Sequence, residues 1–170
     1  MSTSGFGPAP TIVSSTSDLA RARAIAEQPV KAGASWFVWI AGLSLVNSLV
    51  GMFGGGIHFI VGLGITQFVD AIAHEAGSTG IVLDLIINGF VAGIFVLFWK
   101  FGAKGQKWAF VVGMLVYALD GLLLLAFKDI LSVAFHAYAL FRIYQGFAGV
   151  SRLEQLQQAA LASGGSIQPR

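Results

Sequence analysis

Apolar positions along the chain gather into long runs that are separated by short polar breaks. Two such runs, residues 81–99 and 108–127, flank a short basic loop at residues 100–107. Each run has about the length that a helix needs to cross a hydrocarbon core of ~30 Å, at ~1.5 Å per residue. The pattern predicts a hairpin of two transmembrane helices, around which we expect the chain to be organised.

Two further runs predict two more spans. Residues 34–53 begin with two tryptophans directly after Lys31, which is the order expected at a headgroup boundary. Residues 130–150 form the last run, and the helical pattern continues through residues 151–162 as an aqueous extension. The sequence therefore predicts an all-α bundle that crosses the membrane repeatedly.

The run at residues 57–73 is ambiguous. It is short for a span, follows three consecutive glycines and contains two more. Its polar residues recur at helical spacing and share one face of a helix; they are Thr66, Gln67, Asp70 and His74. A short segment with a polar stripe favours a re-entrant or interfacial helix, which gives four spans, whereas a full crossing would give five.

Positive charge favours four spans. If residues 57–73 do not cross, only Lys128 lies outside, and the cytoplasmic side receives Arg21, Arg23, Lys31, Lys100, Lys104, Lys107, Arg152 and Arg170. If they cross, this bias disappears. We expect a multi-pass protein of the inner membrane with both termini in the cytoplasm. One similarity favours five spans, because residues 59–70 resemble residues 110–120 and hint at a duplicated unit.

The ends of the chain are more polar than its middle. Residues 1–33 are expected to form a polar cytoplasmic tail, in which Ser17 or Asp18 caps a short helix that Pro29 stops. This tail is either loosely ordered or an amphipathic helix on the membrane surface. Residues 34–150 form the transmembrane bundle, and residues 151–170 form the helix extension followed by a disordered tail.

Composition supports the membrane assignment. Hydrophobic residues make up 56% of the 170 residues and charged residues 11%, whereas soluble domains carry about 25% charged residues. The net charge of +2 is too small to indicate a nucleic-acid partner. The chain has no cysteine, which excludes disulfides and thiolate catalysis.

Polar side chains fall at matched depths inside the predicted spans. Four of them lie about 10 Å below the outer end of their own span, and two more lie nearer the surface or on the 57–73 segment. The four are Asn47, Asn88, Asp120 and His136, and the two are Asp84 and Asp70. Because an aspartate that faces lipid costs about 2.5–3.5 kcal/mol, we expect these groups to point inward and pair with one another.

Three uses compete for this polar cluster. The first is structural, since interhelical hydrogen bonds of about 0.6 kcal/mol each would fix the packing. The second is a proton or ion path, for which aspartate and histidine are suited. The third is a hydrolase metal site that includes His58, His74 and His136, but the sequence has neither an HExxH nor a GxSxG motif. We therefore expect no enzyme, no metal and no cofactor.

Small residues spaced four apart predict close helix contacts, either within the bundle or between copies. These residues are Ser44, Ser48, Gly51, Gly55, Gly89 and Gly93. The last two form a GxxxG motif in an apolar helix.

Two stretches, GASWFVWIAGLSLVNSL (residues 33–49) and FIVGLGITQFVDAIA (residues 59–73), resemble small multipass proteins of bacterial inner membranes that have no assigned function. The resemblance covers residues 33 to about 149 and implies no activity and no residue role. From the residues themselves we expect a non-enzymatic scaffold or accessory subunit in the lipid bilayer that contacts another membrane protein or a second copy of itself. The alternative is a component of proton- or ion-coupled transport that uses the polar cluster.

Overall fold

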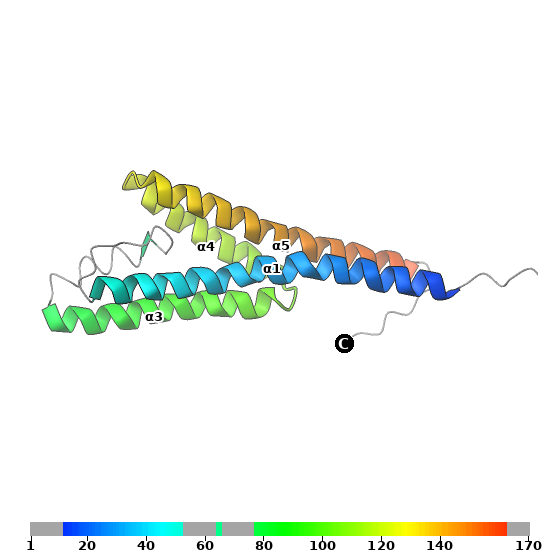
Figure 1. Cartoon of the computed structure of the whole chain (residues 1–170), viewed down its shortest axis with the longest axis horizontal. Coiled ribbons are helices and arrows are strands. Elements are labelled where there is room, and N and C mark those ends of the chain that lie inside the picture. Colours follow the sequence, from blue (N-terminus) through cyan, green and yellow to red (C-terminus); the bar gives the residue numbers. More distant parts are fainter. Residues whose placement is uncertain (1–11, 53–63, 66–76, 163–170) are drawn as a thin grey trace, which may run out of the picture.

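The computed structural model describes residues 12–52, 64–65 and 77–162 of the chain. In this part the chain forms long helices and contains no β-strand (Figure 1). The helices are α1 (Ile12–Met52), α3 (Gly77–Gly102), α4 (Lys107–Ala126) and α5 (Ile130–Ala162). The prediction of an all-α helical bundle is therefore confirmed.

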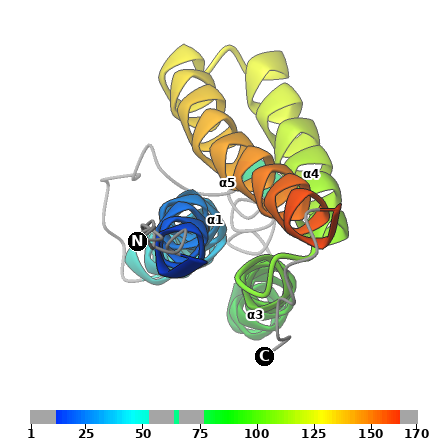
Figure 2. The same ribbon diagram turned by 90° about the vertical axis from the view of Figure 1, so that its right-hand side faces the viewer.

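The predicted hairpin is present, but the bundle is not organised around it. α3 and α4 coincide with the two apolar runs, and the turn between them contains Gly105 with a positive φ of 77°. Among the main helix pairs, α3 and α4 make the smallest contact, whereas α1 packs extensively against both α5 and α3. Figure 2 shows α1 beside these two helices. The expectation that the hairpin is the central element was wrong, because α1 holds that position.

Pro29 does not stop the first helix. α1 is continuous from Ile12 to Met52 with Pro29 inside it, so residues 12–33 are neither a loosely ordered tail nor a separate short helix. An interior proline removes one helix hydrogen bond and costs about 3 kcal/mol. Packing against α5 offsets that loss, since Ala26 and Val30 are buried and the Pro29 ring lies against Gly149.

α1 and α5 are longer than a membrane is thick. With 41 and 33 residues, they extend over about 60 Å and 50 Å, against a hydrocarbon core of ~30 Å. Their far ends run side by side past the ends of α3 and α4 (Figure 1). We call this two-helix projection, residues 12–31 of α1 and 150–162 of α5, the stalk.

The core of the bundle is aromatic. The Phe37 ring on α1 lies 6.2 Å from Phe95, 5.7 Å from Phe98 and 6.1 Å from Phe110, measured between ring centroids. Gly113 on α4 leaves room for this ring, because a Cβ there would lie 2.5 Å from a Phe37 carbon. One aromatic side chain of α1 thus ties α3 and α4 together.

α1 and α5 cross at a pair of glycines. A Cβ on Gly33 would lie 2.5 Å from the Gly146 Cα, so these two backbones are in direct contact. Contacts of this kind between small residues are the usual way in which membrane helices approach closely. The crossing lies at the base of the stalk and fixes how α5 lies on α1.

Among the residues that the structure describes, three helical stretches are long and apolar enough to span a membrane: Ser17–Val50, Leu85–Gly102 and Lys107–Ala126. α5 is not among them, because His136, Arg142 and Gln145 dilute its apolar run. These stretches support a membrane protein. Of the predicted re-entrant segment at residues 57–73, only Gly64 and Ile65 lie within the described part of the chain.

Candidate functional site

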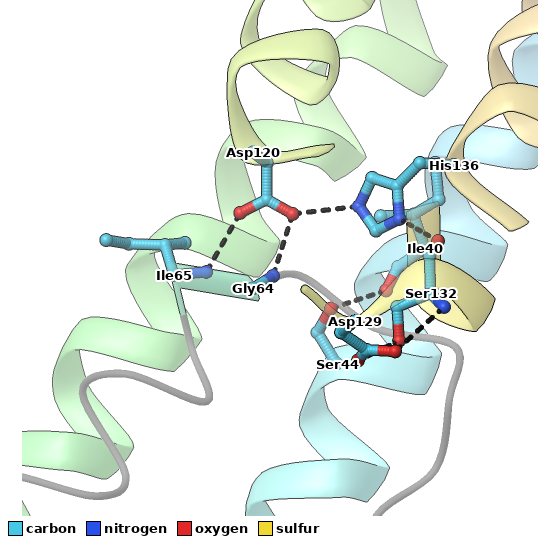
Figure 3. A network of polar contacts seen from close by, with 8 residues as sticks. All are labelled: Ile40, Ser44, Gly64, Ile65, Asp120, Asp129, Ser132 and His136. Atoms are coloured by element: carbon cyan, nitrogen blue, oxygen red, sulfur yellow. Dashed lines mark hydrogen bonds and ion pairs between the residues drawn. The ribbon is translucent and has the colours of Figure 1, made fainter. Parts of the chain in front are cut away.

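Asp120 of α4 and His136 of α5 form a buried pair. The His136 Nε2 atom lies 2.9 Å from Asp120 Oδ2, and both side chains are at least 95% buried. Gly121 makes the approach possible, since a Cβ there would lie 3.3 Å from the His136 Cβ. Figure 3 shows the two side chains pointing toward each other between the helices.

Asp120 also accepts hydrogen bonds from a distant piece of the chain. The backbone N–H of Gly64 donates to Oδ2 at 2.7 Å, and that of Ile65 donates to Oδ1 at 2.9 Å (Figure 3). Two successive backbone donors that bind one carboxylate resemble the free N–H groups of the first turn of a helix. The aspartate therefore joins three parts of the chain: α4, α5 and Gly64–Ile65.

The partners of His136 determine where its hydrogens lie. The Nδ1 atom is 2.8 Å from the Ser132 carbonyl oxygen, which can only accept, so Nδ1 carries a hydrogen. A second hydrogen must lie between Nε2 and Asp120. The Asp120 oxygens also accept two backbone N–H bonds, so the pair shares one hydrogen between Nε2 and Oδ2 and is neutral overall.

Tyr117 forms one wall of this site. Its ring stacks on the His136 ring with centroids 4.2 Å apart and an interplanar angle of 15°. The side chain is fully buried, and its hydroxyl group has no hydrogen-bond partner among the residues that the structure describes. Helical spacing could have indicated both Tyr117 and Ser132, since they lie on the same helix faces as Asp120 and His136, respectively.

Asp129 starts α5 and so sets the direction of His136. It lies directly before the helix, and its side chain accepts a hydrogen bond from the Ser132 backbone N–H at 3.2 Å and another from the Ser132 hydroxyl (Figure 3). This is an N-cap at the first turn. The turn before it contains Lys128, whose φ of 60° is left-handed.

Asn88 joins α3 to α1. Its Nδ2 atom donates to the Ser48 hydroxyl oxygen at 2.7 Å, and the Ser48 hydroxyl in turn donates to the Ser44 carbonyl at 3.3 Å. All three side chains are buried. Asn88 and Asp120, which we expected in one layer, thus make these bonds to different helices.

The remaining predicted residues lie in different settings. Asn47 is buried in α1. Asp84 belongs to α3, but its side chain lies outside the described part of the structure, as do Asp70 and Gly55 entirely. The two GxxxG residues, Gly89 and Gly93, are exposed on α3, and nothing lies within 4 Å of a Cβ placed on either.

A shallow apolar groove of about 380 Å³ leads to Asp120 from the outside of the bundle. Its lining includes Phe95 of α3, Leu119 and Leu123 of α4, and Ile65. Among the described residues of the lining, Asp120 is the one ionisable residue. The groove brings the buried pair close to the surface that would face lipid.

The chemistry available here is proton binding and hydrogen bonding. In the described ranges, 12–52, 64–65 and 77–162, no three histidine or acidic residues come together in a way that could hold a metal ion. No family model matches this sequence, and it has no match among curated proteins or solved structures.

Proposed function

We propose that this protein is a non-enzymatic membrane scaffold or accessory subunit that acts through contacts between its own helices and those of another membrane protein or a second copy. The observation that carries this proposal is the outer face of α3. Gly89 and Gly93 lie exposed there, beside Ile86 and Phe90, which are 63% and 70% exposed. A GxxxG face that is not used inside the bundle is suited to close contact with a helix outside it.

The opposite face of α3 supports the same reading. Asn88, Ala92, Phe95 and Phe98 are buried against the rest of the bundle. The helix thus has one face for internal packing and another that is apolar and notched by glycines. In a bilayer such a notched face is covered either by lipid or by a helix of complementary shape. A helix that packs there can bring its backbone into contact with the backbone of α3.

The proposed topology has four spans. α5 follows α4 after a short turn and packs along it, so it returns through the layer that α4 crosses. Its polar residues Ser132 and His136 are buried, whereas Ile130, Leu131 and Phe141 are among its exposed residues. This outward apolar face suits lipid.

The segment around Gly64 and Ile65 is proposed to enter the bundle and return. Asp120, which binds it, lies about 9 Å from the end of α4 at 1.5 Å per residue. Two N–H groups available to a side chain at this depth favour a helix start inside the membrane over an uninterrupted crossing. With this re-entrant segment, the charge distribution favours cytoplasmic termini in an inner membrane.

In this proposal the Asp120–His136 pair has a structural role: it locks α4, α5 and Gly64–Ile65 together. The competing function is proton-coupled transport. It is favoured by the hydrogen between Nε2 and Oδ2, and by the groove that leads to Asp120. Replacing Asp120 by asparagine separates the two, because transport predicts lost flux with intact assembly, whereas the structural role predicts loss of stability or assembly.

Association through α3 is tested by resonance energy transfer between labelled copies in vesicles at decreasing protein density. We expect Gly89→Leu/Gly93→Leu to abolish the transfer. Gly42→Leu is the matched control, since Gly42 is also exposed on a long helix with nothing within 4 Å of its Cβ position. Equal transfer in all three proteins, or none in the wild type beyond random proximity, would contradict self-association through this face.

A further inference from the structure

A second groove lies where the stalk meets the α3–α4 turn. It has a volume of about 440 Å³. Its lining comes from α1 and α5 and from Lys104 and Gly105 of the turn. An exposed tryptophan lies on each side of the turn, Trp99 near the end of α3 and Trp108 at the start of α4, and tryptophan is typical of the headgroup level. The groove thus begins at the boundary of the bilayer.

Two cations from different elements converge on this groove. Lys104 is exposed and makes no ion pair with any described residue. Arg23 of α1 donates from Nε to Glu27 at 3.2 Å, while its two terminal nitrogens make no hydrogen bond within the described part of the chain. A guanidinium group has five N–H donors, so most of them remain available to an anion.

The carboxylate in the lining is already engaged. Glu154 of α5 forms a short ion pair with Lys107 at the start of α4. Lys107 thus compensates the charge of Glu154 as Glu27 compensates that of Arg23, and Lys104 leaves the described part of the lining with a net positive charge. The terminal nitrogens of Arg23 remain available as donors beside it. The rest of the lining is largely apolar, with Leu19, Val150, Leu153 and Leu156.

We propose that this groove binds the headgroup of an anionic phospholipid from the adjacent leaflet. The phosphate lies between Lys104 and Arg23, and the leucine and valine side chains cover the apolar part of the lipid next to it. Basic pockets at the ends of membrane helices are suited to phosphate headgroups. An inorganic anion would use the two cations but not the apolar wall, so the lining favours an amphiphile.

The test uses the full-length protein in detergent with equal amounts of phosphatidylglycerol and phosphatidylcholine that carry the same acyl chains. Native mass spectrometry counts the lipids that remain bound. At about 1 kcal/mol for each cation near the headgroup, Arg23→Gln/Lys104→Gln lowers the preference for phosphatidylglycerol about thirtyfold. Lys104→Gln alone, in an exposed turn where folding is not at stake, lowers it about fivefold.

The matched control is Lys31→Gln/Lys100→Gln, which removes the same charge near the same boundary but outside the groove. The proposal expects the control to keep the wild-type preference. An equal loss in the control would assign the preference to the overall surface charge and overturn the site. Displacement of phosphatidylglycerol by millimolar inorganic phosphate would overturn the lipid as occupant, and an unchanged preference in Lys104→Gln would overturn the role of the turn.

Discussion

Replacing Asp120 by asparagine changes one oxygen of the buried carboxylate into a hydrogen-bond donor. In the wild type, the two side-chain oxygens accept hydrogen bonds from the Gly64 and Ile65 N–H groups, and Oδ2 also shares a hydrogen with His136 Nε2. An asparagine side chain has only one acceptor oxygen at this position. If that oxygen faces Ile65, the new NH₂ group faces Gly64 N–H; if it faces Gly64, the NH₂ group faces Ile65 N–H. One backbone donor is left without a partner in either orientation.

The size of the effect follows from this count. A buried donor that loses its partner costs about 1–3 kcal/mol. The Nε2 atom of His136 can still accept a hydrogen bond from the asparagine NH₂ group, while its Nδ1–H donates to the Ser132 carbonyl oxygen. We therefore expect Asp120→Asn to lower the free energy of unfolding by about 1–3 kcal/mol. Asp120→Ala removes every acceptor and is expected to cost about 3–5 kcal/mol, as when a buried pair loses one partner.

The assay is reversible unfolding in mixed micelles with increasing sodium dodecyl sulfate, followed by the helical circular dichroism signal. Asp129→Asn is the matched control, because it makes the same chemical change at an N-cap, where asparagine and aspartate are nearly equivalent. Asp120→Asn and Asp129→Asn with the same stability as the wild type would refute the view that Asp120 holds Gly64–Ile65 in place.

Two further substitutions test the helix contacts by the same unfolding assay. Gly33→Ala places a Cβ 2.5 Å from the Gly146 Cα and should lower the free energy of unfolding by about 1–3 kcal/mol. Gly42→Ala is the control and should not lower it, because nothing lies within 4 Å of a Cβ there. Equal effects of the two substitutions would contradict the close crossing of α1 and α5. A double-mutant cycle of Asn88→Ala and Ser48→Ala isolates the bond between these two side chains, and its coupling energy should be about 0.6 kcal/mol. A coupling energy of zero would show that this bond does not hold α3 to α1.

Apolar run length predicted the helices well because a membrane helix must satisfy its own backbone. The bounds of α3, α4 and α5 follow the runs closely, including the extension of α5 to Ala162. The prediction that Pro29 ends a helix was wrong because the sequence shows only the local cost of a proline inside a helix. The packing of α1 on α5, which offsets that cost, cannot be read from the sequence. The Gly33–Gly146 crossing was likewise invisible, because the two glycines are far apart in the chain and belong to no local motif.

The candidate site was only partly accessible from the sequence. Counting residues from the α4–α5 turn places Asp120 and His136 at the same depth, because α4 ends and α5 begins at that turn. Depth does not reveal which helices face each other, and Asn88 bonds to Ser48 of α1 instead of to the aspartate. Every residue except proline has a backbone N–H group, so a sequence pattern does not indicate which of them binds a side chain. The bonds from Gly64 and Ile65 to Asp120 could therefore be found only in the structure.

The number of spans is tested most directly by where single cysteines react in intact cells, since the chain has none of its own. The positions are Lys104 in the α3–α4 turn, Phe127 in the α4–α5 turn and Arg152 in the stalk, all of them exposed. With four spans and cytoplasmic termini, a membrane-impermeant maleimide labels position 127 but neither 104 nor 152 until the cells are opened. Labelling of 127 and 152 together, with 104 protected, would mean that α5 does not cross, and would contradict the four-span bundle.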